Sequence, residues 1–175
     1  MFSDAKRKRK REEMRDMRTG IGYDSHRFAE NRGLVIGGVT VPYEKGLAGH
    51  SDADVLVHAV IDALMGAANL GDIGKVFPDN DGRFKDISSL LLLKRTAEML
   101  DLKGYRVVNV DSVVVMQEPR IGKFTPQMAE NIASALGIES SRVCVKGKTD
   151  EGLGFVGRVE GVKAFASVLI EESGE

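Results

Sequence analysis

Cysteine, histidine and long apolar runs are scarce in this 175-residue sequence, which has one cysteine, Cys144, and three histidines. A single cysteine excludes a disulfide within the chain. No apolar run approaches the roughly 20 residues of a membrane-spanning helix, so we expect a soluble protein of the cytoplasm. The hydrophobic fraction of 42% and the charged fraction of 29% are typical of one globular domain.

Charge is unevenly distributed, although the formal net charge is only −1. Residues 1–18 carry eight Lys or Arg against four Asp or Glu, and residues 19–175 carry a net −5. No apolar segment follows the basic cluster, so it is not a secretory signal. We expect a solvated extension, residues 1–18, before a single domain, residues 19–175. The alternatives are contact with nucleic acid or an anionic surface, and a natural start at Met14 or Met17.

Strand-like and helix-like segments alternate along the chain. Strands are predicted over residues 18–24, 105–117, 142–149 and 159–172, with a hairpin over residues 34–44. Helices with capping residues or an early proline are predicted over residues 51–70, 87–104 and 125–137. This alternation indicates an α/β (α+β) fold, a two-layer sandwich rather than a bundle or barrel, and we expect a mixed β-sheet with helices on one face.

Two segments between these elements are rich in turn-forming residues. GDIGKVFPDNDGRF, residues 71–84, predicts a loop or short helical turn long enough to act as a lid. EGLGFVGR, residues 151–158, is by itself typical of a turn-rich connector, because scattered glycines are a weak signal for phosphate binding.

Two of the three histidines lie close to acidic residues in ways that suggest a metal site. Asp24 and His26 in GIGYDSHRF share one side of an extended backbone. His58 lies among apolar residues in VLVHAVI, so we expect its ring to be partly buried and to need hydrogen-bond partners. Taken alone, such a residue is most simply interpreted as a structural histidine whose ring nitrogens are hydrogen-bonded. Together the three residues form an open-site ligand set for zinc or a similar divalent ion, with the fourth position left for substrate.

The predicted helix over residues 51–70 carries a polar stripe. Asp54, His58 and Asp62 are spaced four residues apart and therefore lie on one face. Asp54 or Asp62 could supply the carboxylate that fixes the tautomer of a ligand histidine, and the sequence leaves both open.

Three stretches carry a resemblance to a known family, within a match from Thr19 to Ile170: GIGYDSHRF, IGGVTVPYEKGLAGHSDADVLVHAVIDALMGAANLGDIGKVFPD and KGKTDEGLGFVGRVEG. In these stretches the chain resembles the 2-C-methyl-D-erythritol 2,4-cyclodiphosphate synthase family of the non-mevalonate isoprenoid pathway. It implies a homotrimer of α/β subunits whose sheets surround a central axis, with active sites between neighbouring subunits.

The resemblance also implies roles for individual residues. Asp24, His26 and His58 match the family's zinc ligands, the set that the spacing also indicates. Glu151 matches the ligand of a second cation, magnesium or manganese. His50 and Thr149 match catalytic residues that stabilise the transition state.

The positions that match the family's substrate-binding residues fall into four groups. The phosphate and metal region contains Asp24, Ser25, His26, His50 and Ser51. The methylerythritol pocket and flap contain Asp72, Ile73, Gly74, Phe77, Pro78, Asp79, Asn80 and Asp81. The nucleotide site, expected from the adjacent subunit, contains Met116, Gln117, Glu118, Pro119, Arg120, Ile121, Gly122, Lys148, Thr149, Asp150 and Glu151. Phe155 and Arg158 match residues near substrate or at the trimer axis.

Four residues depart from the family's usual pattern. Ser25 stands where Val is frequent, and we expect its side chain to point away from the metal. Lys148 and Asp150 stand where Thr is common, and Gly147 where Ala is common, so we expect local hydrogen bonding to the nucleotide phosphates to differ from the family's usual pattern.

The activity implied is cyclisation of 4-diphosphocytidyl-2-C-methyl-D-erythritol 2-phosphate to the 2,4-cyclodiphosphate, a phosphorus-oxygen lyase reaction that releases CMP. Two alternatives remain open. One is a zinc-dependent phosphoester hydrolase, with Asp62 or His50 as general base. The other is a non-catalytic trimer whose central cavity binds an isoprenoid diphosphate through Arg158.

Overall fold

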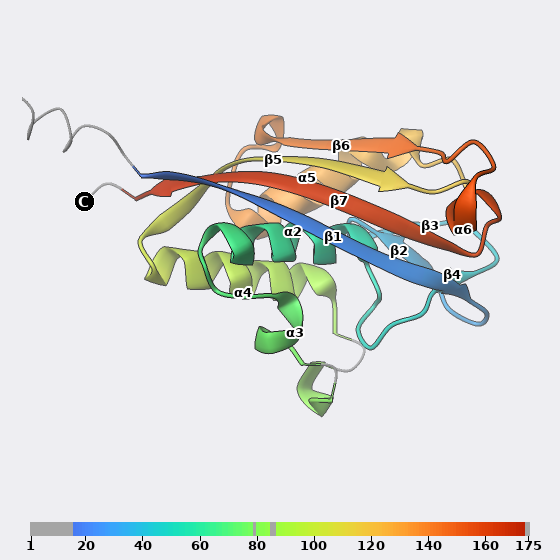
Figure 1. Ribbon diagram of the computed structural model, residues 1–175, viewed down its shortest axis with the longest axis horizontal. Coiled ribbons are helices and arrows are strands. Elements are labelled where there is room, and N and C mark those ends of the chain that lie inside the picture. The colour runs from blue at the N-terminus through green and yellow to red at the C-terminus, as the bar shows by residue number, and fades with distance from the viewer. Residues whose placement is uncertain (1–15, 79, 85–86, 174–175) are drawn as a thin grey trace, which may run out of the picture.

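A five-stranded sheet forms one layer of the structure, a computed structural model that describes residues 16–78, 80–84 and 87–173 (Figure 1). Its strand order is β4-β1-β7-β5-β6, and a separate two-stranded hairpin pairs β2 with β3. The strands are β1 (Met17–Ala29), β2 (Leu34–Ile36), β3 (Val39–Val41), β4 (Gly46–Leu47), β5 (Tyr105–Val115), β6 (Val143–Lys148) and β7 (Gly161–Glu172). Among the strand pairs of the described residues, β5 and β6 are parallel and the others antiparallel, so the expectation of a mixed sheet is confirmed.

The three long helices lie together on one face of this sheet (Figure 1). The helices are α2 (Val55–Ala67), α3 (Ile73–Val76), α4 (Ser89–Leu102), α5 (Thr125–Leu136) and α6 (Gly154–Gly157), with 3₁₀ turns at η1 (Gly82–Phe84), η2 (Gly122–Phe124) and η3 (Ser140–Arg142). The two-layer arrangement is confirmed. The first long helix begins later than predicted, at Val55, because Asp54 is its N-cap and has extended backbone angles.

Glycines on β1 allow α2 to pack unusually close to the sheet. A Cβ atom at Gly20 or Gly22 would lie 1.9 Å from the carbonyl oxygen of Ala63 or Ala59, respectively. Helix α2 fills the space between the layers, and ten of its thirteen residues are buried. The glycine spacing of β1 therefore sets the distance between the helix and the strand that carry the candidate site.

Strand β1 is longer than predicted. It pairs with β7 from Met17 to Arg27 and with β4 at Phe28 and Ala29, so Asp24 and His26 lie within the strand and not at its end. Its start at Met17 falls inside the expected basic extension, of which residues 1–15 lie outside the described residues. Long-range pairing with the C-terminal strand extends β1, and local sequence carries no sign of it.

Candidate metal centre

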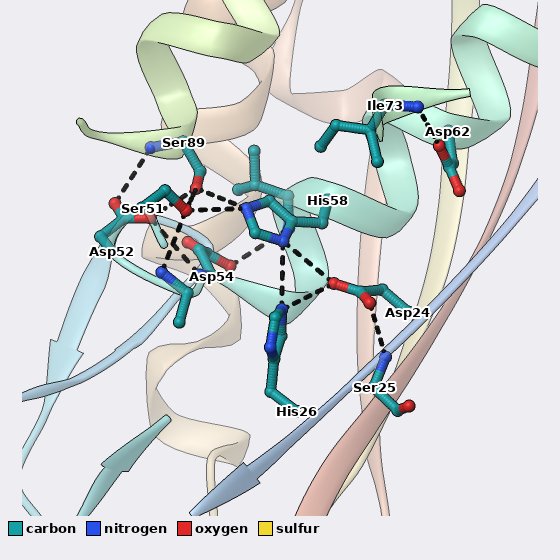
Figure 2. A network of polar contacts seen from close by, with 12 residues as sticks. Asp24, Ser25, His26, Ser51, Asp52, Asp54, His58, Asp62, Ile73 and Ser89 are labelled. Atoms are coloured by element: carbon teal, nitrogen blue, oxygen red, sulfur yellow. Dashed lines mark hydrogen bonds and ion pairs between the residues drawn. The ribbon is translucent and has the colours of Figure 1, made fainter. Parts of the chain in front are cut away.

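Asp24 and His26 from β1 meet His58 from α2 in one cluster (Figure 2). Oδ2 of Asp24 lies 2.8 Å from Nε2 of His26 and 3.0 Å from Nδ1 of His58. The two ring nitrogens are 3.2 Å apart. Within the described residues, this is the one group of three or more His, Cys, Asp or Glu side chains whose ligand atoms converge.

The cluster forms because of the packing of β1 against α2. Alternation along the strand places Asp24 and His26 on the face toward the helix, whereas Ser25 between them is exposed, as expected. The close approach at Gly22 brings the first turns of α2, and with them His58, against this face. All three side chains are mostly buried.

Electrostatics in the cluster favour a cation. Burial acts to raise the pKa of Asp24, but hydrogen bonds from His26 and His58 outweigh it and hold that pKa well below its usual range. For His26, burial acts to lower the pKa, and the hydrogen bond and charge of Asp24, together with the backbone of Ala48, raise it overall. One carboxylate and two imidazoles converging on one point fit zinc or another divalent transition metal.

The prediction that Asp54 or Asp62 fixes the tautomer of a ligand histidine is wrong, because both carboxylates accept hydrogen bonds from backbone N–H groups. Asp54 is fully buried and accepts hydrogen bonds from the backbone N–H groups of Gly37, Gly38 and Val57, at 2.9, 2.6 and 3.1 Å. Burial raises the pKa of Asp54 to about 6, against the effect of these hydrogen bonds. Asp62 accepts from the backbone N–H of Ile73 at 2.8 Å. Both carboxylates hold backbone segments in place, and the hydrogen-bond partners of the His58 ring beyond the cluster are the hydroxyls of Ser51 and Ser89.

Sequence reasoning missed Ser89 and Asp52. A serine at the start of one predicted helix and an acid before another are typical of helix caps, and neither pattern indicates contact with a histidine. Their contacts join segments 37 residues apart, which neither spacing nor periodicity reveals.

His50, the candidate catalytic residue of the phosphate and metal region, lies beside the predicted lid. Its Nε2 is 3.4 Å from the carbonyl oxygen of Asp81. Asp72 caps the short helix α3, accepting from the N–H of Lys75 at 3.0 Å. Asp79 lies outside the described residues.

The two segments predicted to bind the nucleotide lie side by side. The N–H of Met116 donates to the carbonyl of Lys148 at 2.9 Å, and the side chain of Ile121 packs against Gly147. The hydroxyl of Thr149 donates to the carboxylate of Glu151, on a turn where Glu151 has a φ of +50°. This pair is separate from the three-residue metal cluster within the described chain.

The remaining two candidate residues lie near the end of the sheet. Phe155, in α6, is partly exposed, and Arg158 forms an ion pair with Glu160 at 2.7 Å. Across the described ranges, no helix combines the length and apolar character needed to span a membrane.

Comparisons with known proteins give one consistent result. The chain is 60% identical over 157 residues to a 2-C-methyl-D-erythritol 2,4-cyclodiphosphate synthase from Syntrophomonas wolfei, covering 90% of this chain and 100% of the relative. It is 58% identical to the synthase of the same name from Caldicellulosiruptor bescii, covering 89% of this chain and 99% of the relative.

Solved structures agree with these relatives. The IspF structure from Plasmodium falciparum, a CDP complex, matches with a TM-score of 0.79 and 33% identity, covering 90% of this chain and 97% of that one. The bifunctional IspDF from Campylobacter jejuni matches with a TM-score of 0.87 and 42% identity; 91% of this chain is covered, but it spans only 43% of the bifunctional chain. The YgbB family model matches residues 17–171, and the chain therefore belongs to the YgbB family.

Proposed function

We propose that this protein cyclises 4-diphosphocytidyl-2-C-methyl-D-erythritol 2-phosphate to 2-C-methyl-D-erythritol 2,4-cyclodiphosphate, with release of CMP, in the non-mevalonate isoprenoid pathway. The observation that carries the proposal is the converging Asp24, His26 and His58 cluster. It lies in a chain that aligns along nearly its whole described length with synthases of this name.

The reaction forms one bond and breaks one. An oxygen of the 2-phosphate attacks the β-phosphorus of the diphosphate, and the bond between that phosphorus and the oxygen bridging to the α-phosphate breaks. CMP leaves with the bridging oxygen, and no protein nucleophile is required. Catalysis then consists mostly of placing the two groups in line and neutralising charge on the phosphate oxygens.

The metal centre would be held by Asp24, His26 and His58. A zinc ion bound there supplies Lewis-acid stabilisation of negative charge on a phosphate oxygen, and magnesium or manganese at Glu151 supplies the same to the diphosphate. The three ligands are only 12–28% exposed, and this partly buried setting would strengthen their interactions relative to bulk water.

His50 and Thr149 would stabilise charge that develops on the phosphates. His50 lies in the segment before α2 with its ring beside the predicted lid, where it would donate to an oxygen of the bound diphosphate. Thr149 lies beside Glu151, so its hydroxyl and the second cation would act on the same group. The segments Met116–Gly122 and Lys148–Glu151 are adjacent, which supports a shared nucleotide site like the one that the CDP complex of the Plasmodium falciparum relative suggests.

The proposed assembly is a homotrimer in the cytoplasm, with the outer face of the sheet around the central axis. This face carries exposed apolar side chains, among them Ile21, Tyr23 and Phe165. The rings of Tyr23 and Phe165 contact each other across β1 and β7, with centroids 5.1 Å apart and planes tilted by 46°. An apolar, helix-free sheet face of this kind is suited to burial between subunits.

Turnover of the cytidyl substrate tests the activity. The purified protein is incubated with zinc and magnesium, and the products are followed by phosphorus NMR, with a chelator-treated sample as control. We expect CMP and the cyclic diphosphate in equal amounts. Release of inorganic phosphate would instead indicate the hydrolase, and no turnover would leave the non-catalytic binding protein as the better interpretation.

A further inference from the structure

His58 has partners on the side of its ring that faces away from Asp24 and His26 (Figure 2). Its Nε2 lies 2.9 Å from the hydroxyl of Ser89 and 3.1 Å from that of Ser51. Ser89 is completely buried. Ser89 is the first residue of α4, a helix that contributes none of the three metal ligands.

Asp52 holds Ser89 by two atoms. One carboxylate oxygen accepts from the backbone N–H of Ser89 at 3.0 Å, and the other accepts from its hydroxyl. The N–H of Asp52 donates in turn to the carbonyl of Ile87 at 3.2 Å. Asp52 thereby supplies the side-chain cap that α4 does not receive from its own N-cap, Ser88.

The proton of the Ser89 hydroxyl decides the direction of the hydrogen bond between Ser89 and His58. A serine hydroxyl has one proton, and that of Ser89 is donated to the carboxylate of Asp52. Toward His58 the Ser89 oxygen therefore acts as an acceptor, and the 2.9 Å hydrogen bond places a proton on Nε2 of the ring, a proton that the Ser51 hydroxyl at 3.1 Å can also accept. With a proton fixed on Nε2, Nδ1, whose partner in the metal-free protein is Asp24, is the nitrogen that a metal ion binds.

We infer that Asp52 and Ser89 are positioning residues of the metal centre, which keep a proton on Nε2 of His58 and Nδ1 directed at the metal. The inference rests on the proposed role of His58 as a ligand. It gives α4 a part in metal binding, because the start of this helix orients a ligand carried by α2.

The substitution Asp52→Asn tests the inference with little change in shape. The amide oxygen must still accept from the backbone N–H of Ser89, so the amide NH₂ faces the Ser89 hydroxyl and donates to it. The hydroxyl proton then turns toward Nε2 of His58 or toward Ser51. We expect the metal-free ring to shift toward the Nδ1–H tautomer, and zinc affinity to fall by about 10- to 100-fold.

Ser89→Ala is the second variant, because it removes the hydroxyl and keeps the backbone cap of α4. Its matched control is Ser112→Ala, which removes another buried hydroxyl, one that donates to the carbonyl of Cys144 at 2.8 Å. Zinc affinity is measured by competition with a chelator. Tautomers are read by ¹⁵N NMR of metal-free protein labelled at histidine, and only three rings contribute to the spectrum.

Lower zinc affinity in both site variants, with the altered His58 tautomer in Asp52→Asn and wild-type behaviour of Ser112→Ala, supports the inference. Wild-type affinity and an unchanged Nε2–H signal in Asp52→Asn and Ser89→Ala overturn it. If Asp52→Asn does not fold, Ser89→Ala decides alone. Full zinc binding by His58→Ala would instead reject the ligand assignment on which the inference rests.

Discussion

The metal cluster and the turn that carries Thr149 and Glu151 are built in opposite ways. The cluster takes its residues from the interior of a long strand and the first turns of a buried helix. The turn has Glu151 and Gly152 at positive φ, and the ion pair of Asp150 with Lys163 at 2.7 Å ties it to the sheet. Packing therefore determines the geometry of the first region, and a few polar contacts determine that of the second.

The largest expected effect is the loss of a cluster ligand. His58→Ala removes one of three converging ligands, so we expect zinc binding to fall by more than the roughly 10- to 100-fold typical of losing an outer partner. Turnover should fall in parallel, while nucleotide binding persists because the turn is left intact. Metal analysis of the purified protein and CDP binding measured by calorimetry check the two halves. Equal loss of zinc and CDP binding would contradict the separation of the two regions.

Packing beneath the cluster gives the next largest effect. Gly22→Ala places a methyl group 1.9 Å from the carbonyl oxygen of Ala59, so α2 must move away from β1. We expect a decrease of about 1–3 kcal/mol or more in the free energy of unfolding, with weaker zinc binding. Denaturant unfolding measures the first and chelator competition the second.

The matched control for this packing prediction is Gly66→Ala within α2. No heavy atom lies within 4 Å of its added methyl group. Alanine has the higher helix propensity, so we expect this variant to gain about 0.5–1 kcal/mol. Destabilisation of both variants to the same degree would show that close packing against β1 is not the cause.

A smaller effect is expected when the turn is loosened. Lys163→Ala removes the ion-pair partner of Asp150, and we expect CDP affinity to fall a few-fold with zinc affinity unchanged. Lys146→Ala is the control, because the ion pair of Lys146 with Asp111 joins β6 to β5 outside the turn and is more exposed. Unaltered CDP binding by Lys163→Ala would mean that this ion pair does not hold the turn.

The smallest effect concerns the pH dependence of the metal-free protein. Asp24 raises the pKa of His26 above its ordinary value of 6.5 in the folded state. The stabilisation that follows is fully present below about pH 6.5 and is lost as the pH rises through the raised pKa. His26→Gln should therefore flatten the fall in unfolding free energy above pH 6.5, measured by denaturant titration at several pH values. A slope identical to that of the wild type would count against a charged His26.

Local patterns predicted the main elements and the three candidate metal ligands that the fold brings together, because alternation along β1 and helical spacing around His58 are visible in the sequence. The later start of α2 could not be predicted, since it depends on Asp54 binding the N–H groups of Gly37 and Gly38 in a distant hairpin. The same holds for Asp52 and Ser89, whose contact joins the starts of two helices. The sequence contained these residues, but only the fold pairs them. The roles of the substrate residues stay predictions.

The alternation of β1 also allows the intrinsic fluorescence of the protein to report on the outer face of the sheet. Tyr23 is next to Asp24 in the chain but lies on the opposite, exposed face, and the sequence has three tyrosines and no tryptophan. Ultraviolet emission of the folded protein therefore comes from tyrosine without a stronger emitter to mask it. A subunit or ligand that covers the outer face is therefore expected to change the emission of Tyr23, the residue next to Asp24 of the metal cluster.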